Sequence, residues 1–181
     1  MKLSRAAIPD IVLLEPRVIG DARGFFFESW NRHTLAELGL VADFVQDNHS
    51  RSVRNVLRGL HYQAGEHAQG KLIRVIDGEI YDVAVDLRRS SPTFGRWAAF
   101  TLSADNRSMA WIPPGFAHGY CVTADAADVL YKVTGYWHPE SERTLAWNDP
   151  DLAIPWPLAG PPVLSAKDAA GTRLADAETY P

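Results

Sequence analysis

The sequence predicts an all-β protein built as an antiparallel sandwich or barrel. Short apolar-rich runs recur along the chain, and glycine or proline marks the corners between them. The segments between these runs are too short for the helices that connect parallel strands. Only one convincing helix falls in the first half, where Asn31 is placed to cap residues 33–38 and Gly39 to end them.

The first strands are expected on either side of a tight turn. Residues 9–20 form an apolar run between Pro9 and Gly20, residues 21–24 have turn chemistry, and residues 25–30 are aromatic-rich. The polar run at residues 46–50 is by itself typical of a solvated loop. Asn55 follows, a residue type that tolerates the left-handed conformation of a turn.

The strongest hairpin signal is Asp77-Gly78, which lies between residues 71–76 and 79–87. The second arm alternates apolar and mixed positions, as a half-buried strand does. Further strands are expected at residues 97–102, 109–112, 119–123 and 128–136. From Pro139 onward, a tail rich in proline and aspartate is expected to wrap the barrel and to end in a helical turn near Asp168. No linker is evident, so we expect one domain over residues 1–181 with a core barrel at about 40–140.

Composition excludes several function classes. The net charge is −4, with 46% hydrophobic and 22% charged residues, so we expect neither a nucleic-acid nor a membrane partner. The lone cysteine, Cys121, lies among apolar strand residues, where it is expected to be inert. The apolar run at residues 11–14 is too short for a signal segment or a membrane span, which favours a cytoplasmic protein.

Polar residues are concentrated at residues 58–63, with Lys71 close behind. This stretch joins Arg58, His61 and two polar hydrogen-bonding groups, and it leads into a run that looks buried. Polar groups in that position usually line a pocket. The plainer alternative is that His61 is a core residue whose hydrogen bonds are satisfied and that Arg58 is a surface charge.

A second motif, Pro113-Pro114-Gly115-Phe116-Ala117-His118, fits the second sequence pattern of the cupins. We therefore expect a cupin-type jelly-roll barrel with a few short helices and a C-terminal tail packed on it. In a metal-binding cupin the first pattern supplies two histidines, but only His61 stands in that place here. His61, His118 and either Glu66 or Glu79 make a weak ligand set, so no metal is expected. His118 is alternatively a structural histidine at the barrel mouth.

The remaining chemistry is acid–base catalysis without a cofactor. The chain has no Gly-x-Ser-x-Gly elbow and no glycine-rich phosphate loop. His61 has the unperturbed pKa that suits a base near neutrality. Tyr131 is either an acid or a core aromatic, and Asp168 is either the partner that orients His61 or a solvated tail carboxylate.

The chain resembles the dTDP-4-dehydrorhamnose 3,5-epimerase family over nearly its whole length. The matching segments occur in order and at matching spacing, at residues 21–28, 46–50, 56–63, 71–75, 82–88, 91–95, 112–119, 131–132 and 147–150. The resemblance implies a homodimeric enzyme that epimerises C3 and C5 of dTDP-4-keto-6-deoxy-D-glucose without a cofactor. It makes His61 the base, Tyr131 the acid on the other sugar face, Asp168 the partner of His61, and Lys71 the stabiliser of the enolate.

The same resemblance implies a set of substrate-binding residues. Trp137 would stack on the thymine, at a place where tyrosine is more familiar. Thr144 stands where a glycine would be expected, a minor departure. The other implied contacts to the nucleotide sugar come from Arg23, Phe25, Glu28, Gln46, Asn48, Arg58, His118, Glu142 and Lys167.

Elementary chemistry agrees with these roles. A C4 ketone acidifies the C–H bonds at C3 and C5, so the reaction needs a base, an acid on the opposite face and a cation at the developing oxyanion. Arginines suit the diphosphate because their forked donors bind its oxygens in pairs. Alternatives are a mono-epimerase or ketoisomerase of the same family, a non-catalytic sugar-nucleotide-binding cupin, and a metal-dependent cupin oxygenase.

Overall fold

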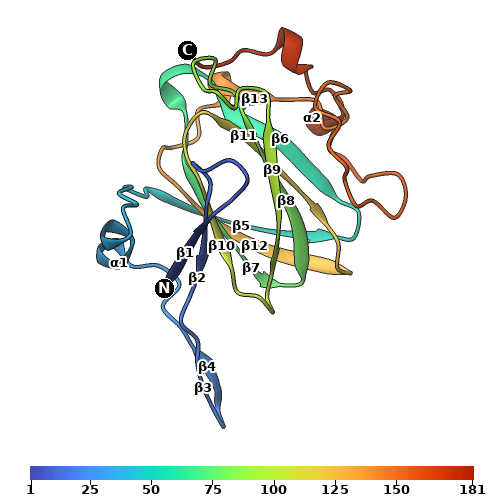
Figure 1. Ribbon diagram of the computed structural model, residues 1–181. Coiled ribbons are helices and arrows are strands. Elements are labelled where there is room, and N and C mark those ends of the chain that lie inside the picture. Colours follow the sequence, from blue (N-terminus) through green and yellow to red (C-terminus); the bar gives the residue numbers. More distant parts are fainter.

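Two antiparallel sheets pack face to face in the computed structural model, which describes residues 1–181 (Figure 1). The six-stranded sheet contains, in spatial order, β1 (Lys2–Arg5), β2 (Val12–Glu15), β10 (Met109–Ile112), β7 (Lys71–Asp77), β12 (Ala126–Val133) and β5 (Gln46–Val53). The five-stranded sheet contains β13 (Glu142–Thr144), β6 (Leu57–Gln63), β11 (Phe116–Val122), β8 (Glu79–Asp86) and β9 (Trp97–Ser103). The expected all-β jelly roll is confirmed.

The helices are short, as expected. α1 spans Arg32–Glu37, and its cap Asn31 accepts hydrogen bonds from the backbone N–H groups of His33 and Thr34. α2 spans Ala166–Ala169, the predicted helical turn at Asp168. Single 3-10 turns occur at Gly65–His67, Pro139–Ser141 and Leu174–Asp176. None of the helices has the length and apolar character needed to cross a lipid bilayer.

The core follows from strand alternation. Ile73 on β7 points between the two sheets, while its neighbour Leu72 points to the outer face, where it packs with Leu35 of α1. On β8, Ala84 belongs to the cluster between the sheets and Val83 to a second cluster beneath the C-terminal tail. Both faces of β8 are therefore covered, and the expectation of a half-buried strand was wrong because the tail buries its outer side.

The predicted hairpin at Asp77-Gly78 was also wrong. β7 pairs with β10 and β12, whereas β8 pairs with β11 and β9, so the two strands lie in different sheets. Asp77 still belongs to β7, which leaves only Gly78, with φ +73°, as the connection. One residue cannot supply a two-residue hairpin turn, and the chain instead crosses from one sheet to the other.

The N-terminal expectations need two corrections. The run at residues 9–20 is interrupted after Glu15, at Pro16, and becomes β2 and β3 (Ile19–Asp21). β4 (Gly24–Phe26) is shorter than the expected strand at residues 25–30 and pairs with β3 as a two-stranded hairpin. This hairpin extends away from the body of the molecule (Figure 1), and Phe25 and Phe26 on it are 60% and 69% exposed.

The polar run at residues 46–50 lies in β5 rather than in a loop. Gln46, Asn48 and Ser50 are half-buried on the inner side, while Asp47 and His49 are exposed on the outer side. Period-two alternation is thus present, but both faces are polar, which hides it from a search for apolar residues. Asn55, just beyond β5, has φ +63°, as expected.

Candidate active site

A cavity of about 380 Å³ opens at one end of the jelly roll. It is bounded by strands of both sheets and by the loop that follows β12. Seven of the predicted site residues line it, so the structure brings together residues that lie far apart in the sequence. The lining residues are Gln46, Asn48, His61, Tyr62, Gln63, Gln69, Lys71, Tyr131, Val133, Trp137 and Glu142.

His61 and Asp168 form a hydrogen-bonded pair at this cavity. The imidazole Nε2 of His61, on β6, lies 2.5 Å from Oδ1 of Asp168, on α2. Asp168 is only 3% exposed. Its Oδ2 accepts a hydrogen bond of 2.7 Å from the Ser165 hydroxyl, and its Oδ1 one of 3.3 Å from the Gly59 backbone N–H. Burial disfavours the ionised carboxyl, but these hydrogen bonds outweigh it and lower the pKa of Asp168 to about 2.

The backbone of β6 makes room for this pair. Gly59 has φ +125°, and a Cβ atom there would lie 2.5 Å from the Cα of Gly119 on β11. The two strands therefore approach more closely than any side chain would permit. Gly59 stands two residues before His61, and its N–H is free to donate to Asp168.

His61 is a neutral base in this environment. Burial lowers its pKa below the ordinary value, even though Asp168 favours the imidazolium, and the positive charges of Lys71 and Lys167 lower it further. A carboxylate only accepts hydrogen bonds, so Nε2 carries the proton and Nδ1 holds the free lone pair. The pair with Asp168 thus fixes both the tautomer and the direction of the basic nitrogen.

Lys71 places a positive charge beside this base. Its Nζ donates to the backbone carbonyl of His61 at 3.4 Å. Burial lowers the pKa of Lys71 to about 8, although the negative charges of Asp82 and Glu142 favour its protonated form. The ammonium is therefore mostly charged at neutral pH.

Tyr131 faces the cavity from the other sheet. It lies on β12, in register with Asn48 on β5, whereas His61 belongs to the five-stranded sheet. Burial raises the pKa of Tyr131, so its phenol keeps its proton. An imidazole and a phenol thus enter one cavity from opposite sheets.

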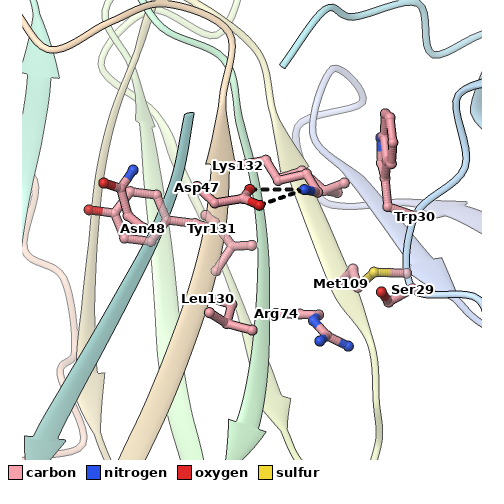
Figure 2. Close-up of a pocket in the computed structure, with 11 residues that line it drawn as sticks. Ser29, Trp30, Asp47, Asn48, Arg74, Met109, Leu130, Tyr131 and Lys132 are labelled. Atoms are coloured by element: carbon pink, nitrogen blue, oxygen red, sulfur yellow. Dashed lines mark hydrogen bonds and ion pairs between the residues drawn. The ribbon is translucent and has the colours of Figure 1, made fainter. Parts of the chain in front are cut away.

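The outer side of the same strand pair carries a second, smaller cavity of about 230 Å³ (Figure 2). There the Lys132 ammonium lies 2.9 and 3.0 Å from the two carboxylate oxygens of Asp47, and 5.1 Å from the ring centroid of Trp30. Lys132 and Asp47 are in register beside Tyr131 and Asn48. The pair links β5 to β12 directly behind the phenol.

Three predicted contacts lie elsewhere in the chain. Arg23 and Phe25 belong to the projecting β3–β4 hairpin, where the Arg23 side chain is 90% exposed and pairs with Asp21. Glu28 accepts hydrogen bonds from Asn31 and Thr34 beside α1. None of the three lines the cavity, so within one chain their role stays a prediction.

Three other predicted contacts lie outside the cavity lining but have partners in or behind it. Lys167 forms a 2.8 Å ion pair with Glu142, which is a lining residue. The Arg58 Nε donates to the Ser52 hydroxyl at 2.9 Å. The His118 ring, only 7% exposed, bonds the buried carboxylate of Asp82 at 2.9 and 3.1 Å. The last contact is of the kind expected if His118 is a structural histidine.

Four lining residues were given no individual role from the sequence, namely Tyr62, Gln63, Gln69 and Val133, although the first two belong to the polar stretch expected to line a pocket. Alternation offered a signal for two of them, because Gln63 is two residues beyond His61 on β6 and Val133 is two residues beyond Tyr131 on β12. No three histidine, cysteine, aspartate or glutamate side chains of the chain converge as metal ligands. Cys121 is fully buried, and burial raises the pKa of its thiol to about 11.

Known proteins are similar to this chain in both sequence and fold. The model of the dTDP-4-dehydrorhamnose 3,5-epimerase family matches residues 5–176. A dTDP-4-dehydrorhamnose 3,5-epimerase of Pseudomonas aeruginosa is 58% identical over the full length of both chains. One from Salmonella typhimurium is 55% identical and covers 96% of each chain. The crystal structure of a 3,5-epimerase from Legionella pneumophila, in complex with dTDP-4-keto-L-rhamnose, superposes with a TM-score of 0.94 at 49% identity, covering 97% of this chain and 93% of that one. The chain described here belongs to the dTDP-4-dehydrorhamnose 3,5-epimerase family.

Proposed function

We propose that the protein is an isomerase that epimerises C3 and C5 of dTDP-4-keto-6-deoxy-D-glucose to give dTDP-4-keto-L-rhamnose, with its own side chains as acid and base. The identity of 58% to an epimerase over its whole length and the bound product in the Legionella structure support this activity. The observation that carries it is the entry of His61, paired with Asp168, and of Tyr131 into one cavity from opposite sheets.

The proposed reaction begins with proton removal by His61. Nδ1 takes the proton from C3 or C5, and the electron pair of the broken C–H bond moves into the ring to form an enolate with the negative charge on O4. The ionised Asp168 stabilises the imidazolium that results. Tyr131 then gives its phenolic proton to the same carbon from the opposite face, which inverts that centre. Proton exchange with solvent restores the imidazole and the phenol.

Lys71 is the proposed stabiliser of the enolate. Its ammonium lies at the cavity beside His61, where a positive charge meets the negative charge that develops on O4. Fixed charges of this kind are worth more in a site shielded from water, and removing one donor costs about 10²–10³ in rate. Lys167 and Arg58 are the proposed partners of the diphosphate, and Trp137, 58% exposed at the cavity, is the proposed platform for the thymine.

The proposed working form is a homodimer in which the β3–β4 hairpin of each copy reaches the cavity of the other. Three features support this assembly. The hairpin projects from the body, its phenylalanines are exposed, and β5, which carries Gln46 and Asn48, is an edge strand that pairs with β12 on one side and with no strand on the other. Arg23, Phe25 and Glu28 would then complete a partner's site.

We also propose that residues 1–181 act as a single epimerase domain around a core barrel at about 40–140. The proposed compartment is the cytoplasm, where a lone buried cysteine stays reduced.

Incubation with dTDP-4-keto-6-deoxy-D-glucose in deuterium oxide tests this function. We expect NMR to show deuterium at C3 and C5 and inversion of both centres, and a His61→Ala variant to show neither. Deuterium and inversion at one carbon only would identify a mono-epimerase. Wild-type incorporation by His61→Ala would remove His61 from the mechanism.

A further inference from the structure

The side-chain amide of Gln63 bonds three backbone groups beside the cavity. Gln63 is the last residue of β6 and is only 4% exposed. Its Nε2 donates to the carbonyls of Tyr136 at 3.2 Å and of His67 at 3.1 Å. Its Oε1 accepts from the backbone N–H of His138 at 2.6 Å. Both hydrogens and the oxygen of this amide are thus used within the protein.

Two of these bonds enclose Trp137. The carbonyl of Tyr136 and the N–H of His138 belong to the peptide groups directly before and after Trp137, and in an extended chain they point to the same side. A neighbouring strand pairs with such groups through its own peptides. Here the amide of Gln63 takes that place, and it holds the backbone of Trp137 as a strand neighbour would.

The third bond joins a second loop to the same point. The His67 carbonyl lies in the turn after β6, and the rings of His67 and His138 stack with centroids 3.9 Å apart and planes inclined by 8°. The backbone of Gln63 is held in turn, because its carbonyl accepts a 2.5 Å hydrogen bond from the Tyr180 hydroxyl. Gln63 is therefore the common anchor of both loops at the cavity mouth.

Trp137 depends on this anchor because little else holds it. Trp137 is 58% exposed and belongs to none of the buried clusters. A large aromatic side chain without packing is held in direction mainly by its backbone. We propose that Gln63 is a positioning residue that fixes Trp137 as the wall on which the nucleotide base of the substrate stacks, an inference that rests on the proposed function.

Two substitutions remove the anchor in different ways. Gln63→Glu keeps the shape but puts a second acceptor oxygen against the carbonyls of Tyr136 and His67, which costs both donated bonds. Gln63→Met keeps the length, adds no charge and removes all three bonds. Each is made in the wild-type protein and with Trp137→Ala. The measurements are dTDP affinity by calorimetry and the kcat and KM of epimerisation, with circular dichroism to establish that each variant is folded.

We expect Gln63→Met to weaken dTDP binding by about tenfold and to raise KM similarly, because the base loses its stacking surface, while kcat stays within about twofold. With Trp137→Ala, the same substitution should change dTDP affinity by less than about twofold, because the wall is already lost. A rise in KM at constant kcat shows that His61, two residues earlier on β6, is undisturbed.

Gln69→Glu is the matched control for the charge of Gln63→Glu. Gln69 lines the same cavity and donates to the Gly135 carbonyl at 2.6 Å, but it bonds neither peptide group that adjoins Trp137. We expect its effect on dTDP binding to be the same with and without Trp137→Ala. Wild-type affinity in Gln63→Met, or an equal loss with and without Trp137, would overturn the positioning role alone. A wild-type protein that binds no dTDP would overturn the proposed function as well.

Discussion

Asp168 and His61 are 107 positions apart in sequence, yet their side chains meet at 2.5 Å through a single imidazole nitrogen. The carboxylate is buried, ionised and held by three donors, so it cannot turn away from the ring. The contact therefore decides which imidazole nitrogen is basic.

Asp168→Asn tests that contact. An amide in this place removes the negative charge that stabilises the imidazolium and can donate to the ring, which favours the wrong tautomer. We expect kcat to fall by about 10²–10⁴ with KM nearly unchanged, as measured by steady-state epimerisation. A kcat within a few-fold of the wild type would mean that His61 does not need this partner.

Tyr131→Phe separates proton removal from proton delivery. The phenyl ring keeps the packing on β12 but cannot donate a proton, so the enolate still forms and is reprotonated mainly from the His61 side. We expect deuterium from solvent to enter the substrate faster than either centre inverts, in contrast to the wild type. Unchanged epimerisation would assign the acid to another group.

Lys71→Met tests the charge that faces the enolate. Methionine matches the length of the buried stem but has no charge, so the O4 oxyanion loses its cation. We expect kcat to fall by about 10²–10³ while circular dichroism and dTDP affinity stay close to wild type. An unchanged kcat would show that another group stabilises the enolate.

The pH profile of kcat/KM should have an acid limb from His61 and an alkaline limb from Lys71. As pH falls, His61 gains a proton and stops acting as a base, and because burial lowers its pKa, this limb lies below the value of a free histidine. As pH rises through about 8, Lys71 loses its proton and with it the charge at O4, so activity falls. Lys71→Arg keeps a charge at all these pH values and should move the alkaline limb upward, whatever its absolute rate. An alkaline limb that does not move would belong to another group.

Mixed dimers test whether the hairpin serves a second copy. His61→Ala and Arg23→Ala are each expected to be weak alone, but a hybrid dimer has one site with an intact His61 and an intact Arg23 from the other chain. After random reassortment we expect recovery of about a quarter of wild-type activity. His61→Ala mixed with Asp168→Asn is the control, because both changes affect the same cavity and no hybrid has an intact site. The same low activity in both mixtures would place Arg23 in its own chain's site.

Local chemistry in the sequence predicted much of the fold. Asn31 marked the start of α1, and the run at residues 109–112 coincides with β10. Asp77-Gly78 misled because a turn signal shows that the chain bends, but not whether the next strand joins the same sheet. Whether the next strand joins the same sheet depends on how the two sheets pack, and that packing is set by contacts between residues distant in sequence.

The site was predictable to the extent that single residues carry it. His61 was singled out from a polar stretch, and the roles of Tyr131 and Asp168 were predicted from the family resemblance. The structure brings His61 to both of the others. Gln63 belongs to the stretch expected to line a pocket, but its proposed positioning role was missed because that role depends on backbone groups up to 75 positions away. Arg23 and Phe25 on the hairpin and Glu28 beside α1 lie away from the cavity of their own chain, so their predicted contacts depend on the proposed second copy.

Where β6 and β11 lie side by side in the five-stranded sheet, Gly59 and Gly119 leave space for hydrogen atoms alone, and a methyl group on either would meet the opposite backbone at 2.5 or 2.7 Å. Alanine at either glycine would force the strands apart and carry the imidazole away from its carboxylate, although neither position touches the sugar. Efforts to enlarge this enzyme's substrate range therefore have freedom at the rim around Trp137 and none at the contact between these two glycines, where even the smallest side chain would displace His61.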